Sequence, residues 1–213
     1  MLPIKLNDDQ KVAKLCGITA PSAEFRIAAL TPRRKKLPVL SVRLPSTIVP
    51  RVPNERTYRI LFVCWGNICR SPAGENVFRH LLSESALANR IECDSAGTID
   101  AHAGKPPDNR MRETLEQRNI PVEGAARQIT REDFGDFDLI LTMDDFNRQE
   151  VLSVAPDASA RAKVKPFTEF CENHEASEVP DPYYGGSSGF ELVADLIEDG
   201  CQGVLAHIEA QLS

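Results

Sequence analysis

The feature that most constrains the fold is a regular alternation of strand-like and helix-like segments after Tyr58. Short apolar runs predict strands at 59–63, 91–96, 137–142 and 162–167. Longer segments with apolar residues at helical spacing predict helices at 71–88, 107–118, 144–154 and 190–212. Strands that alternate with helices favour a parallel sheet covered on both faces. Such sheets bind their ligands at the carboxyl ends of the strands.

A boundary near residue 56 separates two parts of opposite charge. Residues 1–56 hold eleven Lys and Arg against four Asp and Glu, whereas residues 57–213 hold fourteen against twenty-seven. We therefore expect a single domain at 57–213 and a basic, Pro-rich N-terminal extension at 1–56. The extension is either disordered or an organelle transit peptide, although its early Asp8 and Asp9 are unusual for targeting. The expected location is the cytoplasm, or a plastid or mitochondrion if the extension is a transit peptide.

Composition excludes several classes of protein. No apolar stretch approaches the roughly 18 residues that a membrane span needs. The net charge of −6 gives no reason to expect nucleic-acid binding. The six cysteines are dispersed and show neither a CxxC pair nor zinc spacing, which favours a reducing compartment and implies no metal. The sequence indicates no cofactor and no particular oligomeric state.

The strongest chemical signal is a Cys-x5-Arg loop directly after the first predicted strand. Cys64 stands at the end of that strand, and five residues separate it from Arg70. A loop of this length can curl so that the N–H groups of residues 65–70 point inward and bind a tetrahedral oxyanion. We predict that a helix follows, with Ser71 as its N-cap and Pro72 as its first residue. The pattern indicates a thiol nucleophile that attacks phosphorus.

Four segments together resemble the low-molecular-weight protein tyrosine phosphatases. They occur in that family's order and spacing at residues 63–72, 94–98, 143–147 and 181–185. The resemblance covers about residues 58–212. It implies an α/β fold, with a single doubly wound domain, a four-stranded parallel sheet and helices on both faces. It also implies hydrolysis of protein phosphotyrosine and small aryl phosphates without a cofactor, so that the expected partner is a tyrosine-phosphorylated protein.

The resemblance assigns three catalytic roles. Cys64 would be the nucleophile that forms a phosphocysteine intermediate, and Arg70 would clamp the phosphoryl oxygens. Asp181 would protonate the leaving group and then activate the hydrolytic water, a role worth about 10²- to 10⁴-fold in rate. Pro182 would hold Asp181 in an extended conformation.

Further roles are implied for neighbouring residues. The substrate-binding residues would be Trp65, Gly66, Asn67, Ile68, Cys69, Tyr183 and Tyr184. The supporting residues would be Ser71, Ser95, Asp144 and Asn147. Cys69 could also pair with Cys64 as a reversible redox guard, or could simply fill the loop wall. His102 falls in the loop expected to line the pocket mouth, where it could contact substrate.

The sequence departs from the family pattern at two places. Trp65 stands where members mostly carry a smaller aliphatic residue, and Ala101 stands where some relatives place an aromatic on the opposite rim. We hypothesise that Trp65 replaces this missing wall and stacks on the phenyl ring of the substrate. Gly124 stands where some relatives have a histidine in a supporting hydrogen-bond network, which puts that network in doubt.

Three alternatives stay open at this stage. A protein-arginine phosphatase tends to carry threonine in place of Ile68, so the isoleucine favours phosphotyrosine. A thiol-dependent arsenate reductase on the same fold needs further cysteines in a mobile segment, and residues 97–170 contain none. A phosphotyrosine-binding module without turnover is expected to lack Cys64, Arg70 or Asp181, and all three are present.

Overall fold

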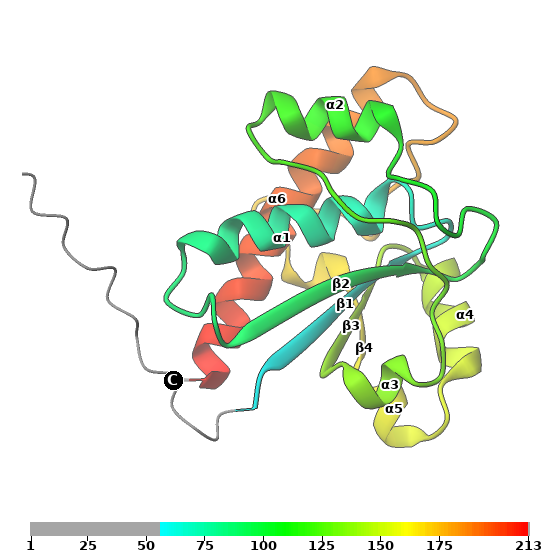
Figure 1. The fold of residues 1–213 in the computed structure, drawn as a ribbon, viewed down its shortest axis with the longest axis vertical. Coiled ribbons are helices and arrows are strands. Elements are labelled where there is room, and N and C mark those ends of the chain that lie inside the picture. Colours follow the sequence, from blue (N-terminus) through cyan, green and yellow to red (C-terminus); the bar gives the residue numbers. More distant parts are fainter. Residues whose placement is uncertain (1–55, 213) are drawn as a thin grey trace, which may run out of the picture. The chain divides into compact units, whose positions relative to one another are not determined.

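The computed structural model describes residues 56–212. Expectations for the N-terminal extension therefore lie outside the described residues, and the proposed boundary near residue 56 stays a prediction. Four strands form one all-parallel sheet in the order β2-β1-β3-β4, as predicted (Figure 1). The strands are β1 (Tyr58–Cys64), β2 (Ile91–Gly97), β3 (Leu139–Thr142) and β4 (Val164–Pro166).

Helices separate the strands and complete the chain. They are α1 (Arg70–Glu84), α2 (Asn109–Gln117), α3 (Asp133–Asp136), α4 (Asp145–Val154), α5 (Ala158–Ala162), the 3-10 helix η3 (Phe167–Phe170) and α6 (Ser187–Leu212). The four long helices match the predicted ones, although α1 ends at Glu84 rather than at residue 88. The short helices α3, α5 and η3 have four or five residues, too few to give a periodic signal.

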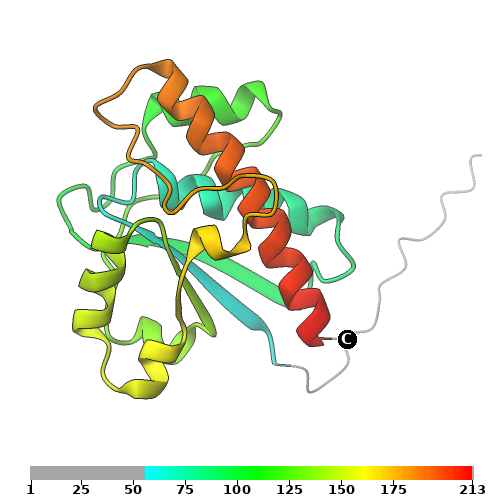
Figure 2. The same cartoon turned by 180° about the vertical axis from the view of Figure 1, so that it is seen from behind.

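The sheet is covered on both faces because its central strand is apolar on both sides. Successive side chains of a strand point to opposite faces. Ile60 and Phe62 of β1 accordingly belong to a core with α1 and α6, whereas Leu61 and Val63 belong to a second core with α3 and α4. Helix α6 packs across α1 and is seen behind it in Figure 1 and in front of it in Figure 2.

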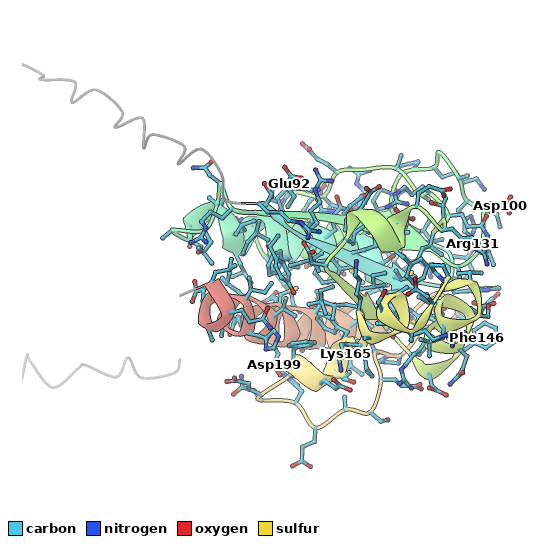
Figure 3. The ribbon with its side chains drawn as sticks, turned by 90° about the horizontal axis from the view of Figure 1, so that it is seen from below. Glu92, Asp100, Arg131, Phe146, Lys165 and Asp199 are labelled. Atoms are coloured by element: carbon cyan, nitrogen blue, oxygen red, sulfur yellow. The ribbon has the colours of Figure 1, made fainter. Side chains whose placement is uncertain are left out.

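The strand order places a ligand crevice at the end of β1. From β1 the chain passes through α1 to β2 on one side, and the next connection crosses back to β3 on the other side. Ligands of doubly wound sheets bind at such a switch point, outside the carboxyl ends of the strands. Cys64 is the last residue of β1. Asp100, after β2, and Phe146, after β3, both lie at this end of the molecule (Figure 3).

The segment that leads to Asp181 is tied down at two points. The buried carboxylate of Asp199 on α6 accepts hydrogen bonds from the backbone N–H groups of Glu172, Asn173 and His174 (Figure 3). Burial alone would raise the pKa of Asp199, but hydrogen bonds from His174 and Asn173 outweigh it and lower the pKa to about 2. Further along, the Val179 N–H donates to the Met143 carbonyl at 2.8 Å.

Candidate active site

The loop between β1 and α1 curls tightly enough to start the helix earlier than predicted. Helix α1 begins at Arg70, so the predicted N-cap at Ser71 is wrong. The Ser71 hydroxyl instead lies 3.0 Å from Cys64 Sγ and 3.1 Å from the Ala96 carbonyl oxygen. A hydroxyl engaged by these two groups is not available to cap the helix. Its position beside the sulfur agrees with the supporting role predicted for Ser71.

Asn67 fixes the loop at its sharpest point. Its backbone has φ +54°, in the left-handed region that asparagine tolerates better than most residues. The side-chain amide donates to the hydroxyls of Ser71 and Ser95, both at 2.9 Å. Its oxygen accepts a hydrogen bond from the Arg127 N–H at 2.9 Å. Asn67 therefore lies buried beneath the loop, where it holds the loop in shape, and it does not line the cavity.

The hydrogen-bond network continues away from the sulfur to a buried carboxylate. Ser95 donates to Glu75 Oε2 at 2.6 Å, and the other oxygen of Glu75 pairs with Arg79. A Cβ built on Gly124 would lie 4.0 Å from Glu75 Oε2, so this glycine faces the end of the network. Where some relatives have a histidine near Gly124, the network in this structure ends at the ion pair of Glu75 with Arg79. Nothing in the sequence distinguishes Glu75 from the other charged residues of a helix.

Gly97 lets the loop lie directly against β2. A Cβ at this position would come within 2.7 Å of the Trp65 carbonyl oxygen, a clash with backbone that only glycine avoids. Because of this close approach, the Thr98 N–H donates to the Cys64 carbonyl at 2.9 Å and the Ile99 N–H donates to the Trp65 carbonyl at 3.2 Å. The carbonyls of Cys64 and Trp65 are thereby bonded to the segment that follows β2.

Arg70 is buried and held in place by groups from two other segments. It donates to Asp144 at 2.5 Å, to the Val179 carbonyl at 3.1 Å and to Asp181 at 3.1 Å. Burial alone would lower the pKa of Arg70, but the Cys64 sulfur and the carboxylates of Asp181 and Asp144 outweigh it and raise the pKa. The guanidinium therefore stays charged next to the thiol.

A cavity of about 230 Å³ opens above the loop. It is lined by Cys64, Trp65, Gly66, Ile68, Cys69, Arg70, Ile99, Ala101, His102, Asp181, Tyr183 and Tyr184. All three predicted catalytic residues thus meet at one site, together with every predicted substrate-binding residue except Asn67. His102 lies over the loop, because a Cβ on Gly66 would come within 2.9 Å of its ring. Ile99 was not predicted, since nothing distinguishes its apolar side chain in the sequence.

Aromatic side chains form part of the cavity wall. Trp65 and Tyr183 are 39% and 37% exposed, and Tyr184 is 85% exposed. The rings of Tyr183 and Tyr184 pack edge to face with centroids 5.0 Å apart. A partly exposed aromatic wall of this kind suits an aryl group.

The second cysteine that lines the cavity, Cys69, does not have the lowered thiol pKa of a nucleophilic cysteine. Cys69 is buried, and burial followed by the carboxylate of Asp108 raises its pKa far above the usual range. Cys64 and Cys69 are both free thiols in this structure. Cys69 is therefore protonated at neutral pH while it shares the cavity with Cys64.

The two supporting residues on α4 behave differently. Asp144 caps the helix by accepting the Asn147 N–H at 2.6 Å while its second oxygen binds Arg70. The Asn147 side chain is fully buried, and its amide finds no hydrogen-bond partner within residues 56–212. Asp144 thus touches the catalytic arginine directly, whereas Asn147 is connected to it through the helix cap.

Residues 56–212 contain no group of three or more His, Cys, Asp or Glu side chains placed to hold a metal ion. Over that range, no helix is both long and apolar enough to span a bilayer.

Comparison with known proteins agrees with this geometry. A family profile described as low molecular weight phosphotyrosine protein phosphatase matches residues 59–213. A Synechocystis protein, provisionally named a low molecular weight protein-tyrosine-phosphatase, is 47% identical over 154 residues, 72% of this chain and 98% of its own. The Bacillus subtilis low molecular weight protein-tyrosine-phosphatase is 40% identical over 71% of this chain and 96% of its own.

Solved structures give the same result. A protein tyrosine phosphatase from Entamoeba histolytica, crystallised with Hepes in its active site, superposes with a TM-score of 0.71 at 39% identity. The alignment covers 74% of this chain and 100% of that one. The chain therefore belongs to the low-molecular-weight phosphotyrosine protein phosphatase family. It is an enzyme of the protein-tyrosine-phosphatase class, with that family's four-stranded α/β fold.

Proposed function

We propose that this phosphatase hydrolyses protein phosphotyrosine through a phosphocysteine intermediate. The observation that carries the proposal is the meeting of Cys64, Arg70 and Asp181 at one cavity. The Cys64 thiolate attacks phosphorus, the P–O bond to the tyrosine breaks, and Asp181 gives its proton to the departing oxygen. Water then attacks the phosphocysteine, Asp181 takes a proton from that water, and the S–P bond breaks to release inorganic phosphate.

Arg70 and the loop amides bind the phosphoryl group in this proposal. A guanidinium has five N–H donors, and three hydrogen bonds hold Arg70 to Asp144, Val179 and Asp181. The remaining donors can bind two phosphoryl oxygens side by side. Because Arg70 is already fixed and charged, it stabilises the developing charge without rearrangement.

A panel of substrates tests the proposed function against its alternatives. We expect turnover of a phosphotyrosine peptide and of p-nitrophenyl phosphate, with much slower release of phosphate from phosphoarginine. Arsenate with a thiol reductant is expected to give no arsenite. The apolar Ile68 and the aromatic side chains that line the cavity support this preference for aryl phosphates. A higher kcat/KM on phosphoarginine, thiol-dependent arsenate reduction, or tight peptide binding without turnover would each contradict the proposal.

Trp65 is proposed to stack on the phenyl ring of the substrate. It lines the same cavity as Ala101, a residue too small to form a wall. We expect Trp65→Leu to raise KM for p-nitrophenyl phosphate by about fivefold, because an aromatic contact is worth roughly 1 kcal/mol. Steady-state kinetics checks this, with Phe146→Leu as the control, since Phe146 is also an exposed aromatic but lies outside the cavity lining. An unchanged KM in Trp65→Leu would refute the stacking role.

Cys69 is proposed to protect Cys64 during oxidation. Peroxide converts the Cys64 thiolate to a sulfenic acid. The Cys69 sulfur then attacks this sulfur while its proton passes to the departing hydroxyl, which forms a disulfide and releases water. The raised pKa of Cys69 makes it a poor first target for peroxide, so peroxide reacts with Cys64 first.

The redox role predicts a difference in recovery rather than in basal rate. After peroxide treatment, dithiothreitol should restore most activity of the wild type and of Cys93→Ser. The Cys69→Ser variant should stay largely inactive, because its sulfenic acid is oxidised further to irreversible forms. Equal recovery in all three proteins, measured by p-nitrophenyl phosphate turnover, would show that Cys69 only fills the loop wall.

A further inference from the structure

One exposed arginine on α2, Arg110, contacts the segment that carries Asp181 and is linked through Asp108 to the anion loop, residues 64–70. Arg110 donates through Nη1 to the Tyr183 carbonyl oxygen at 3.0 Å. Its guanidinium carbon lies 5.3 Å from the centroid of the Tyr183 ring and 4.6 Å from that of Phe190, the latter on α6. A single side chain therefore contacts the backbone and the ring of Tyr183, two residues beyond Asp181.

The other side of Arg110 is tied to the anion loop. Its Nε and Nη2 donate to the two oxygens of Asp108 at 3.0 and 2.9 Å, a bidentate pair. Asp108 in turn caps α2 and donates its own N–H to the Ile68 carbonyl at 2.8 Å. The guanidinium is thus fixed in orientation by a residue that is bonded to the loop between Cys64 and Arg70.

These contacts reach the Asp181 carboxylate through Tyr183. The Tyr183 N–H donates to Asp181 Oδ1 at 3.1 Å, while the carbonyl of the same residue accepts from Arg110. Asp181 Oδ2 is bound to Arg70. Residues 183–186 are exposed, so few packing contacts restrain this stretch. Fixing Tyr183 from both its carbonyl and its ring therefore fixes the group that orients the carboxyl.

From this geometry we infer that Arg110 is a positioning residue, which holds the Asp181 segment over the anion loop so that proton transfer to the leaving group can occur. The inference rests on the proposed acid role of Asp181. Sequence alone does not reveal it, because Arg110 and Arg112 are two similar charges on one short helix. Within residues 56–212, the Arg112 side chain pairs with Glu116 alone, on the same helix at 3.4 Å, and it does not line the cavity, which makes it a matched control.

The test compares two leaving groups. The ratio of kcat/KM for p-nitrophenyl phosphate to that for phenyl phosphate measures how much the reaction depends on proton donation, because the nitrophenolate leaves readily without a proton. We expect Arg110→Met to raise this ratio by about fivefold, since a small misplacement of a catalytic group is costly. Arg110→Lys keeps the charge but loses the bidentate fork and the stacking, and should give an intermediate ratio.

A general loss of structure would lower both rates and leave the ratio unchanged, so the ratio separates positioning from folding. Asp181→Ala should raise the ratio more strongly, and adding Arg110→Met to it should raise it no further, because both changes act on one proton transfer. The inference fails if Arg110→Met and Arg112→Met give the wild-type ratio while Asp181→Ala shifts it. If Asp181→Ala leaves the ratio unchanged, the acid role itself is refuted and the inference falls with it.

Discussion

Replacing Cys64 by serine is expected to reduce p-nitrophenyl phosphate hydrolysis by on the order of 10⁴-fold or more. A serine hydroxyl is similar in size but is not ionised at neutral pH, so the nucleophile is lost while the cavity keeps its shape. The hydrogen-bond network below the loop stays intact, because Ser71, Asn67 and Ser95 are bonded to one another independently of the sulfur. Steady-state kinetics of the purified variant measures the loss.

Binding and a second cysteine variant separate chemistry from folding. Inorganic phosphate should still bind to Cys64→Ser in calorimetry, since Arg70 and the loop amides are unchanged. Cys93→Ser is the matched control, because burial raises the pKa of the Cys93 thiol to about 12 and this thiol lies outside the cavity lining. Activity that survives Cys64→Ser would exclude the phosphocysteine mechanism.

The second large effect is expected at Arg70. Arg70→Lys should lower kcat by about 10²- to 10³-fold, because a lysine places one point charge where the arginine places a planar fork. A lysine also cannot bind Asp144, the Val179 carbonyl and Asp181 at once while offering further donors to phosphate. The measurement is kcat with p-nitrophenyl phosphate at saturation.

Arg112→Lys serves as the control for the same chemical change on an exposed helix face. Its kcat should match the wild type, since Arg112 contacts Glu116 alone among the described side chains. Thermal unfolding of Arg70→Lys should be followed alongside, because the change leaves the carboxylate of Asp144 with a weaker partner. A kcat within a few-fold of the wild type in folded Arg70→Lys would contradict the clamp role.

The sheet could be predicted from the sequence because each strand is a short apolar run bounded by a helical segment. Cys64 could be placed at the ligand-binding edge by the same argument. The meeting of Arg70 and Asp181 is different, since the two residues lie 111 positions apart. No periodicity connects them, and their joint appearance was expected only from the resemblance to a family.

Other parts of the site depend on tertiary contacts, which produce no recognisable pattern in the local sequence. The helix start at Ser71 was predicted wrongly because serine before proline is a common capping pattern, whereas this hydroxyl is taken by the sulfur. Glu75 and Arg110 are charged residues on helices, as many surface residues are. What distinguishes them is their partners, Ser95 for one and Tyr183 for the other, and those come from distant segments.

The hydrogen of the Ser71 hydroxyl has two possible acceptors, the Cys64 sulfur and the Ala96 carbonyl oxygen. The Ser71 hydroxyl oxygen already accepts a hydrogen bond from Asn67. Its single hydrogen can therefore be donated either to the sulfur or to the Ala96 carbonyl, but not to both at once. While Cys64 carries its proton, the S–H can donate to Ser71 and the hydroxyl can point to Ala96. When the sulfur ionises, rotation of one O–H bond turns the hydrogen toward it. A change of charge on the sulfur can thus be met by a torsion of one light atom, the Ser71 hydroxyl hydrogen.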